Sequence, residues 1–164
     1  VDAELTRPLA RANPFSEFKT WNGDLYLGEA GVMDRTKPVL DGGIEKLDGK
    51  DFRSGGIIVS ELALGGDILD FEILTAEMGV AIISTPQTDV VLFHPGTGEK
   101  ISLLMAGGGY RFAHVLVDRE RSLFYLADRL AENPAVRVFD FTGVENVASR
   151  LPLELPPFKI LLAP

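Results

Sequence analysis

The feature that most constrains the fold is a unit that recurs three times along this chain of 164 residues. In each copy a run of β-forming residues ends at a polar residue and is followed by a turn. The polar residues Asp48, His94 and Asp140 are spaced 46 residues apart. Self-similarity at about 20 to 50 residues indicates a repeat architecture, in which each unit packs on its neighbours. The three copies are GGIEKLDGKD, DVVLFHPGTGEK and AVRVFDFTGVEN.

Each copy is accompanied by three further short runs that are typical of strands. Two lie upstream and one downstream, so that four strands follow one another in every unit. Four antiparallel strands in about 40 to 55 residues are typical of a β-propeller blade. The sequence therefore predicts an all-β fold, a β-propeller fragment of about three four-stranded blades in a single domain, 1–164. The expected blades span about 14–67, 68–109 and 110–156.

The two ends of the chain carry pieces of further blades in this interpretation. PPFKILLA restarts the first strand of another blade, at 157–164, and VDAELTRPLARA is typical of the outer strand of a preceding blade. Three blades cannot close a ring, since the smallest propellers have about four. We therefore expect the remaining blades to come from a separate chain or from self-association. A dimer of half-propellers is less favoured, because its terminal strands would have to share a blade without the two strands between them.

Local chemistry agrees with a stack of blades. Asp or His at the end of the third strand can cap the following turn, and Gly can supply the positive φ that the turn requires. Nearly continuous apolar runs, such as VAII and GIIV, are typical of strands buried on both faces. We expect the aromatic residues that recur in the strands to pack between blades.

Composition excludes several classes of function. The 24 acidic residues outnumber the 16 basic ones, giving a net charge of -8, and the basic residues are scattered. Binding of nucleic acid needs clustered Lys and Arg, so no nucleic-acid partner is expected. No apolar run approaches the roughly 18 to 20 residues of a membrane span. The absence of cysteine excludes disulfides, thiolate zinc sites and cysteine nucleophiles.

The strands expected to line the axial channel contain the candidates for a metal site. Glu17 and Asp70 occupy matching positions at the start of the first strands of their units, and His114 lies in the first strand of the third unit. Carboxylates at a channel mouth could bind Ca²⁺ or act as acid and base. They could equally be solvated or cap backbone amides. His94 lies at a blade turn, and no HExxH spacing is present, so we expect no cofactor, with Ca²⁺ as the alternative.

A second set of candidates lies in the loop between the second and third strands of the third unit. Asp128, Arg129 and Asn133 could contact a ligand there. The structural alternative is favoured: Asp128 and Asn133 would satisfy local backbone groups, and Arg129 would cover the rim.

Several phrases of the sequence resemble the YVTN-type bacterial β-propellers, among them LFYLADR, NPAVRVFD and LPPF, which are similar to the recurrent "LYVADR…NPGVRVFD…LPPF". The resemblance extends over nearly the whole chain. Members of that group are exported, often lipid-anchored proteins of the cell envelope and commonly have seven blades. The resemblance thus implies an exported protein of the periplasm or outer cell envelope, and it also raises the expectation of a lipid anchor in the full-length form.

Two functions are compatible with these features. The favoured one is a non-catalytic β-propeller scaffold or ligand- or protein-binding module, with a protein partner on one face, because no coherent catalytic set is present. The alternative is a lactonase-like propeller hydrolase with a divalent metal in the axial channel. The Asn ligands that such enzymes use are not evident in this sequence.

Overall fold

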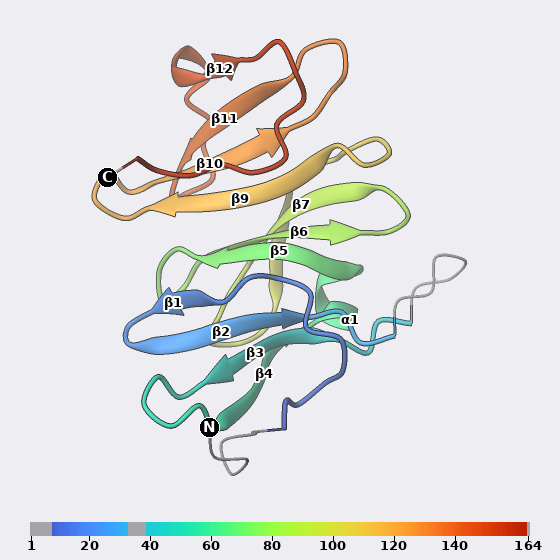
Figure 1. Cartoon of the computed structure of the whole chain (residues 1–164), viewed down its shortest axis with the longest axis vertical. Coiled ribbons are helices and arrows are strands. Elements are labelled where there is room, and N and C mark those ends of the chain that lie inside the picture. Colours follow the sequence, from blue (N-terminus) through green and yellow to red (C-terminus); the bar gives the residue numbers. More distant parts are fainter. Residues whose placement is uncertain (1–7, 33–38, 164) are drawn as a thin grey trace.

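The computed structural model describes residues 8–32 and 39–163. Within this part, the chain forms three four-stranded antiparallel sheets that are stacked on one another (Figure 1). In each sheet the strands follow one another in chain order, so every connection within a sheet is a hairpin. No helix of the described part is long and apolar enough to cross a membrane. The predicted all-β fold of three four-stranded blades is confirmed.

We name the sheets blades 1, 2 and 3. Blade 1 contains β1 (Lys19–Trp21), β2 (Asp24–Glu29), β3 (Gly43–Leu47) and β4 (Ser54–Ser60). Blade 2 contains β5 (Asp67–Ile73), β6 (Gly79–Ser84), β7 (Thr88–Phe93) and β8 (Lys100–Met105). Blade 3 contains β9 (Phe112–Asp118), β10 (Leu123–Asp128), β11 (Ala135–Asp140) and β12 (Leu151–Pro152). Each expected blade range encloses one sheet, except that β5 begins one residue earlier, at Asp67.

Two expected strands are shorter than their sequence runs. In GIIVSELA the last three residues belong to a short helix, α1 (Glu61–Leu64), because the Ser60 side chain accepts a hydrogen bond from the N–H of Ala63 and caps it. In VASRLPLEL the first three residues form a 3₁₀ turn, η2 (Val147–Ser149), which leaves only two residues in β12.

The expected terminal strands are not formed in the described residues. Residues 157–163 pair with no strand there. Of the N-terminal run, residues 1–7 lie outside the described residues, and residues 8–12 are not in a strand. The carbonyls of Ala12 and Asn13 instead accept hydrogen bonds from the backbone beyond the end of β2. Residues 10–13 are therefore hydrogen-bonded to blade 1.

Blade 2 is buried on both faces. Ala81, Ile83, Val91 and Phe93 pack in one apolar cluster with side chains of blade 1. Their neighbours in β6 and β7 pack with blade 3 in a second cluster, to which Phe124 and Phe139 contribute a stacked ring pair; these neighbours are Val80, Ile82, Val90 and Leu92. Successive strand residues point to opposite faces, so the apolar run of each strand supplies both interfaces.

The three residues spaced by 46 positions cap the hairpins between the third and fourth strands, as predicted. The side chain of each accepts hydrogen bonds from backbone N–H groups of the turn that follows. Its own N–H also closes the turn by bonding to a carbonyl four or five residues ahead. The side-chain acceptors and their donors are Asp48 with Lys50 and Asp51, His94 with Gly96 and Thr97, and Asp140 with Thr142 and Val144.

Glycine supplies the positive φ in two of these hairpins but not in the third. Gly98 has φ +73° and Gly143 has φ +86°. At the corresponding place in blade 1, Phe52 has φ +56°, so a residue other than glycine takes this conformation there. The Phe52 side chain is half exposed, and its positive φ has a local energetic cost.

We predict that Gly98→Ala lowers the free energy of unfolding by about 1 to 2 kcal/mol, because Ala disfavours positive φ. Its Cβ would also lie 2.6 Å from the carbonyl oxygen of Ile58. Gly96→Ala, in the same turn but without positive φ, is the matched control and is expected to cost less. Denaturant unfolding measures both, and equal losses would contradict the role of φ.

Candidate binding site at the inner strands

The first strands of the three blades, β1, β5 and β9, lie next to one another on one side of the stack (Figure 1). Charged side chains from them meet where the blades touch. The ammonium nitrogen of Lys19 lies 3.1 Å from an oxygen of Asp70 and 3.1 Å from an oxygen of Glu72. All three side chains are buried. An ion pair of this kind joins blade 1 to blade 2 in place of apolar packing.

The three channel candidates come together at this place. Asp70 belongs to the buried cluster, and its second oxygen accepts a hydrogen bond from the backbone of β9. The Nε2 atom of His114 lies 3.9 Å from that oxygen. Glu17, on the segment that enters β1, forms an exposed ion pair with Lys159. The sequence therefore placed Glu17, Asp70 and His114 on a common side of the molecule, as expected for inner strands.

Two adjoining hollows border this cluster. One, of about 240 Å³, is lined by Lys19, Glu72 and Arg119 together with apolar side chains. The other, of about 190 Å³, is lined by Asp70 and aromatic side chains. Glu17, His114 and Lys159 border both.

Burial and neighbouring charges have opposite effects on the pKa values of these groups. Burial alone would lower the pKa of Lys19, but Asp70 and Glu72 outweigh it and raise that pKa above its ordinary value. Burial raises the pKa of Glu72 to about 7 despite the neighbouring ammonium. Burial also lowers the pKa of His114, which favours the neutral imidazole. Of Lys19, Glu72 and His114, Lys19 is thus the group that keeps its charge near neutral pH.

This arrangement bears on calcium binding. A divalent cation would need several oxygen ligands around one point. Here Lys19 already lies between two carboxylates and supplies the positive charge that they require. Among the described residues no group of three or more His, Asp or Glu side chains is arranged to hold a metal ion. Ca²⁺ binding at Glu17, Asp70 and His114 remains a prediction, and a bound ion would have to compete with this ammonium.

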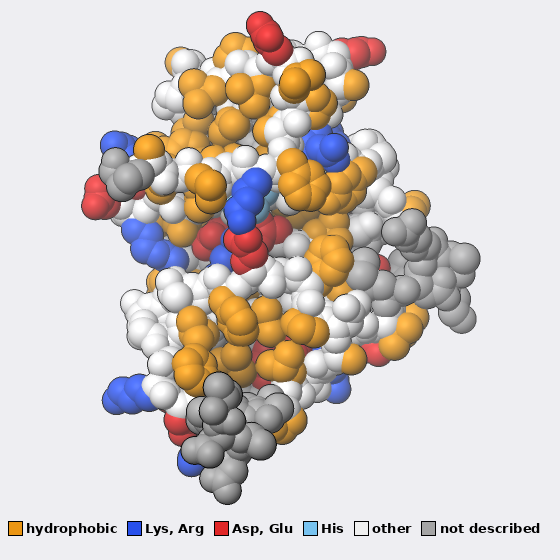
Figure 2. All heavy atoms as spheres, in the orientation of Figure 1, with side chains coloured by type: hydrophobic (Ala, Val, Ile, Leu, Met, Phe, Trp, Pro, Cys, Tyr) orange, Lys and Arg blue, Asp and Glu red, His pale blue; other side chains and the backbone are white. Residues whose placement is uncertain are grey.

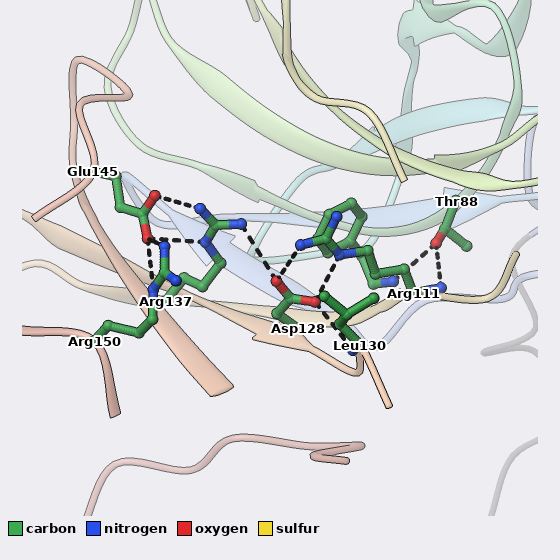
Figure 3. Close-up of polar contacts among 8 residues, drawn as sticks. Thr88, Arg111, Asp128, Leu130, Arg137, Glu145 and Arg150 are labelled. Atoms are coloured by element: carbon green, nitrogen blue, oxygen red, sulfur yellow. Dashed lines mark hydrogen bonds and ion pairs between the residues drawn. The ribbon is translucent and has the colours of Figure 1, made fainter. Parts of the chain in front are cut away.

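The loop candidates have structural partners. Asp128 is buried and receives two hydrogen bonds from the guanidinium of Arg111, at 2.8 and 2.7 Å, and a third from Arg137 at 3.3 Å (Figure 3). It also accepts the N–H of Leu130. Burial would raise the pKa of Asp128, but Arg111 and its other donors outweigh it and lower that pKa. The carboxylate is fully engaged and points away from solvent.

The network continues to the outer side of blade 3. Arg137 also pairs with Glu145, and Glu145 pairs with Arg150 at 2.7 Å (Figure 3). The chain of alternating charges therefore connects β10 and β11 with the residues on either side of η2. It holds the residues that lead into β12 against the sheet, where few backbone hydrogen bonds are available.

Arg129 and Asn133 also have local roles. The guanidinium of Arg129 lies over the rings of Tyr110, at 5.0 Å, and Phe158, at 5.6 Å. The backbone N–H of Asn133 donates to the carbonyl of Leu130 and closes the turn. Arg129 thus covers a rim, while Asn133 acts through its backbone and not through its side chain.

Sequence reasoning missed three groups of charged residues. Lys19 and Glu72 were detectable, because each is a charge inside a strand expected to be buried. Arg119 could not be detected from the sequence. Its guanidinium donates to carbonyls of Thr20 in blade 1 and Ile73 in blade 2, and backbone acceptors have no sequence motif. It therefore ties the turn after β9 to both other blades.

The third missed group is a buried carboxyl pair on blade 1. Glu29 and Glu45 are fully buried, and each accepts one backbone N–H, from Arg11 and Ala10 respectively. Each also has one buried oxygen without a partner in the described part of the chain. Burial and the neighbouring Glu45 raise the pKa of Glu29 to about 7, so Glu29 is partly protonated at neutral pH.

We predict that Lys19→Met lowers the free energy of unfolding by about 3 to 5 kcal/mol, because it leaves Asp70 and Glu72 buried without a counter-charge. Lys46→Met removes a more exposed ion pair with Asp24 and is the matched control, with an expected loss below about 1 kcal/mol. Thermal and denaturant unfolding measure both. Similar losses in the two variants would show that the buried cluster adds no special stability.

We also predict a pH dependence from the carboxyl pair. Because the pKa of Glu29 in the folded chain is raised from 4.5 to about 7, its contribution is complete below pH 4.5 and is lost as pH rises through 7. Stability should therefore fall between pH 5 and pH 8. Glu29→Gln, whose amide does not titrate, should remove on the order of 2 kcal/mol of that fall. The exposed Glu77→Gln is the control, and an unchanged profile in Glu29→Gln would refute the raised pKa of Glu29.

Comparison with known proteins identifies the fold of this chain. No protein-family model matches the chain. No curated protein matches it either. Among solved structures, a chain in the crystal structure of a nidogen/laminin complex is similar, with a TM-score of 0.56 and 11% sequence identity over 80% of this chain and 43% of that one. The chain thus spans less than half the length of that neighbour. Together with the three stacked sheets, the likeness identifies the fold as part of a β-propeller.

Proposed function

We propose that this chain is part of a non-catalytic β-propeller that serves as a protein-binding module. The observation that carries the proposal is the number of exposed apolar side chains on blade 3 and on the residues after it. Figure 2 shows orange side chains over this end of the molecule. They are Val144, Val147, Leu151, Leu153, Leu155, Phe158, Leu161 and Leu162, which we call the blade 3 patch. Large exposed apolar patches are typical of protein interfaces.

The charged groups described above support binding over catalysis. Asp128 is paired with Arg111, Glu145 is paired with Arg137, and Asp70 and Glu72 share an ammonium. A catalytic site needs an acid, base or nucleophile that faces a substrate. The nidogen/laminin structure that resembles this chain is a protein complex, which agrees with a role in protein association.

We further propose, from the resemblance of LFYLADR and NPAVRVFD to YVTN-type propellers, that the protein is exported to the bacterial cell envelope, in the periplasm or on the outer side. Lipid anchoring of the full-length protein belongs to the same proposal. Fractionation of cells that express the full-length protein tests it, and recovery in the cytoplasm would contradict it.

The alternative, a hydrolase with a divalent metal at the inner strands, has one feature in its favour: Glu17, Asp70 and His114 lie on a common side. Lys19 argues against it, because a metal ion would have to displace or tolerate that ammonium. A rise in thermal stability on addition of calcium ions, together with hydrolysis of a lactone substrate, would favour the alternative.

We predict that Leu153→Asp and Leu155→Asp abolish capture of a partner from a cell-envelope extract, measured by cross-linking and mass spectrometry. The matched control is Leu62→Asp, at an exposed apolar residue of α1 on blade 1. Circular dichroism should be unchanged in all three, since these side chains are exposed. Capture that is unaffected by the patch variants, or lost equally in Leu62→Asp, would contradict the proposal.

A further inference from the structure

Arg129 differs from the other arginines in and around blade 3, because it has no acidic partner among the described residues. Arg119 has no ion pair either, but its guanidinium donates to three backbone carbonyls. Asp128, the residue before Arg129, is already engaged by other guanidinium groups. The arginines that form ion pairs with an aspartate or a glutamate are Arg111, Arg121, Arg137 and Arg150.

Most donors of the Arg129 guanidinium are unused. A guanidinium has five N–H donors. The Nη1 atom of Arg129 reaches the carbonyl oxygen of Tyr110 at 3.5 Å, which is long for a hydrogen bond. Its Nε atom is buried and has no acceptor in the described part of the chain. Because an unpaired buried donor costs free energy, an acceptor from another molecule would stabilise this side chain.

Two aromatic rings hold the guanidinium in place. Its central carbon lies 5.0 Å from the ring centroid of Tyr110 and 5.6 Å from that of Phe158. Contacts of this kind cover the flat face of a guanidinium, whereas its N–H donors lie in its plane. Both residues are also more than half exposed, at 52% and 66%. Another molecule can therefore contact the rings and the donors together.

Tyr110 and Phe158 also line the hollow of about 190 Å³ described above. Its other apolar lining residues are Phe15, Leu69 and Ala113. A buried apolar cavity of about 150 Å³ is large enough for benzene, so this hollow can hold one aromatic or leucine side chain. The two rings thus connect a place for one large apolar side chain with a guanidinium that has free donors.

The charges around this hollow favour an anionic partner. The two carboxylates that border it, Glu17 and Asp70, are each paired with a lysine. Burial lowers the pKa of His114, which favours the neutral imidazole. The described residues therefore leave Arg129 as the unpaired charge at this place. Because the net charge of -8 would repel a run of acidic residues, the complementary group is a single carboxylate.

We propose that Arg129, Tyr110 and Phe158 form a docking site for a peptide segment of the protein partner, in which one aspartate or glutamate lies next to a large apolar residue. The apolar side chain would enter the hollow, and the carboxylate would accept hydrogen bonds from the guanidinium. Arginine and tyrosine are enriched among the residues that dominate binding energy at interfaces. The inference rests on the proposed protein-binding function, and the site adjoins the blade 3 patch, which contains Phe158.

A library of short random peptides, displayed on phage and selected on the whole chain, is the probe. Selected peptides should share an aspartate or glutamate beside a phenylalanine, a leucine or a similar residue. For a selected peptide, replacement of the acidic residue by its amide should weaken binding by roughly tenfold, measured by fluorescence anisotropy. Equal binding of the acidic and amide peptides would overturn the inference, and this comparison requires no variant of the protein.

Variants of the chain identify the group that binds the carboxylate. Arg129→Gln removes the charge, so the acidic and amide peptides should bind to it equally. Arg121→Gln is the matched control, because this exposed arginine of blade 3 is already paired with Asp118, and it should retain the difference between the two peptides. Circular dichroism checks that both variants are folded. A difference that persists in Arg129→Gln, or is lost in both variants, would contradict the assignment.

This inference and the proposed function can fail separately. A selection without acidic residues, or one that yields no peptide, would refute the docking site. Capture of a partner that still depends on Leu153 and Leu155 would then leave the protein-binding function standing. Loss of that dependence, with acid-selective peptide binding intact, would instead refute the role of the blade 3 patch and retain the docking site.

Discussion

The structure depends on burial of blade 2 on both faces. A four-stranded sheet has two surfaces, and β6 and β7 are apolar on both, so blade 2 requires a neighbour on each side. Burial of apolar area is the main favourable term in such contacts. Blades 1 and 3 likewise have two faces, but their far faces have no neighbouring sheet in the described part of the chain. Polar residues on these far faces and on the inner strands are arranged around that constraint.

Charged groups take two different roles at the blade contacts. Lys19, Asp70 and Glu72 hold the inner strands of blades 1 and 2 together, and the charge of Glu72 depends on pH because burial raises its pKa to about 7. Arg119 instead donates hydrogen bonds to backbone carbonyl oxygens. The blades are thus joined by one contact between charged side chains and by a second contact to neutral backbone groups.

The sequence predicted the repeated elements well, because their causes are local. The cap residues Asp48, His94 and Asp140 bond to the turn that directly follows them, so the spacing of 46 residues located three hairpins. The nearly continuous apolar runs of β6 and β7 likewise indicate burial on both faces. Phe52 shows the limit of such reasoning, since a half-exposed aromatic residue can take the positive φ that glycine has in the other two turns.

The site was less predictable, because its contacts are distant in sequence. Asp128 was found as a charged loop residue, but its donors Arg111, just before β9, and Arg137, in β11, lie 17 residues before it and nine after it. Likewise, Lys19 meets Asp70 only because two blades are stacked. The sequence of the terminal segment 157–163 predicts a strand, but the segment pairs with no strand in the described residues. A strand requires a partner as well as a propensity.

The network around Glu145 has a consequence for the outer edge of blade 3. Because β12 is only two residues long, much of β11 lacks a strand beside it, which would make it a template for the strand of another chain. Arg137, Glu145 and Arg150 place paired charges along that edge, and a foreign strand could pair there only by displacing them. Strand addition is thereby directed away from the periphery of the blade stack, which protects the protein from aggregating through its outermost edge.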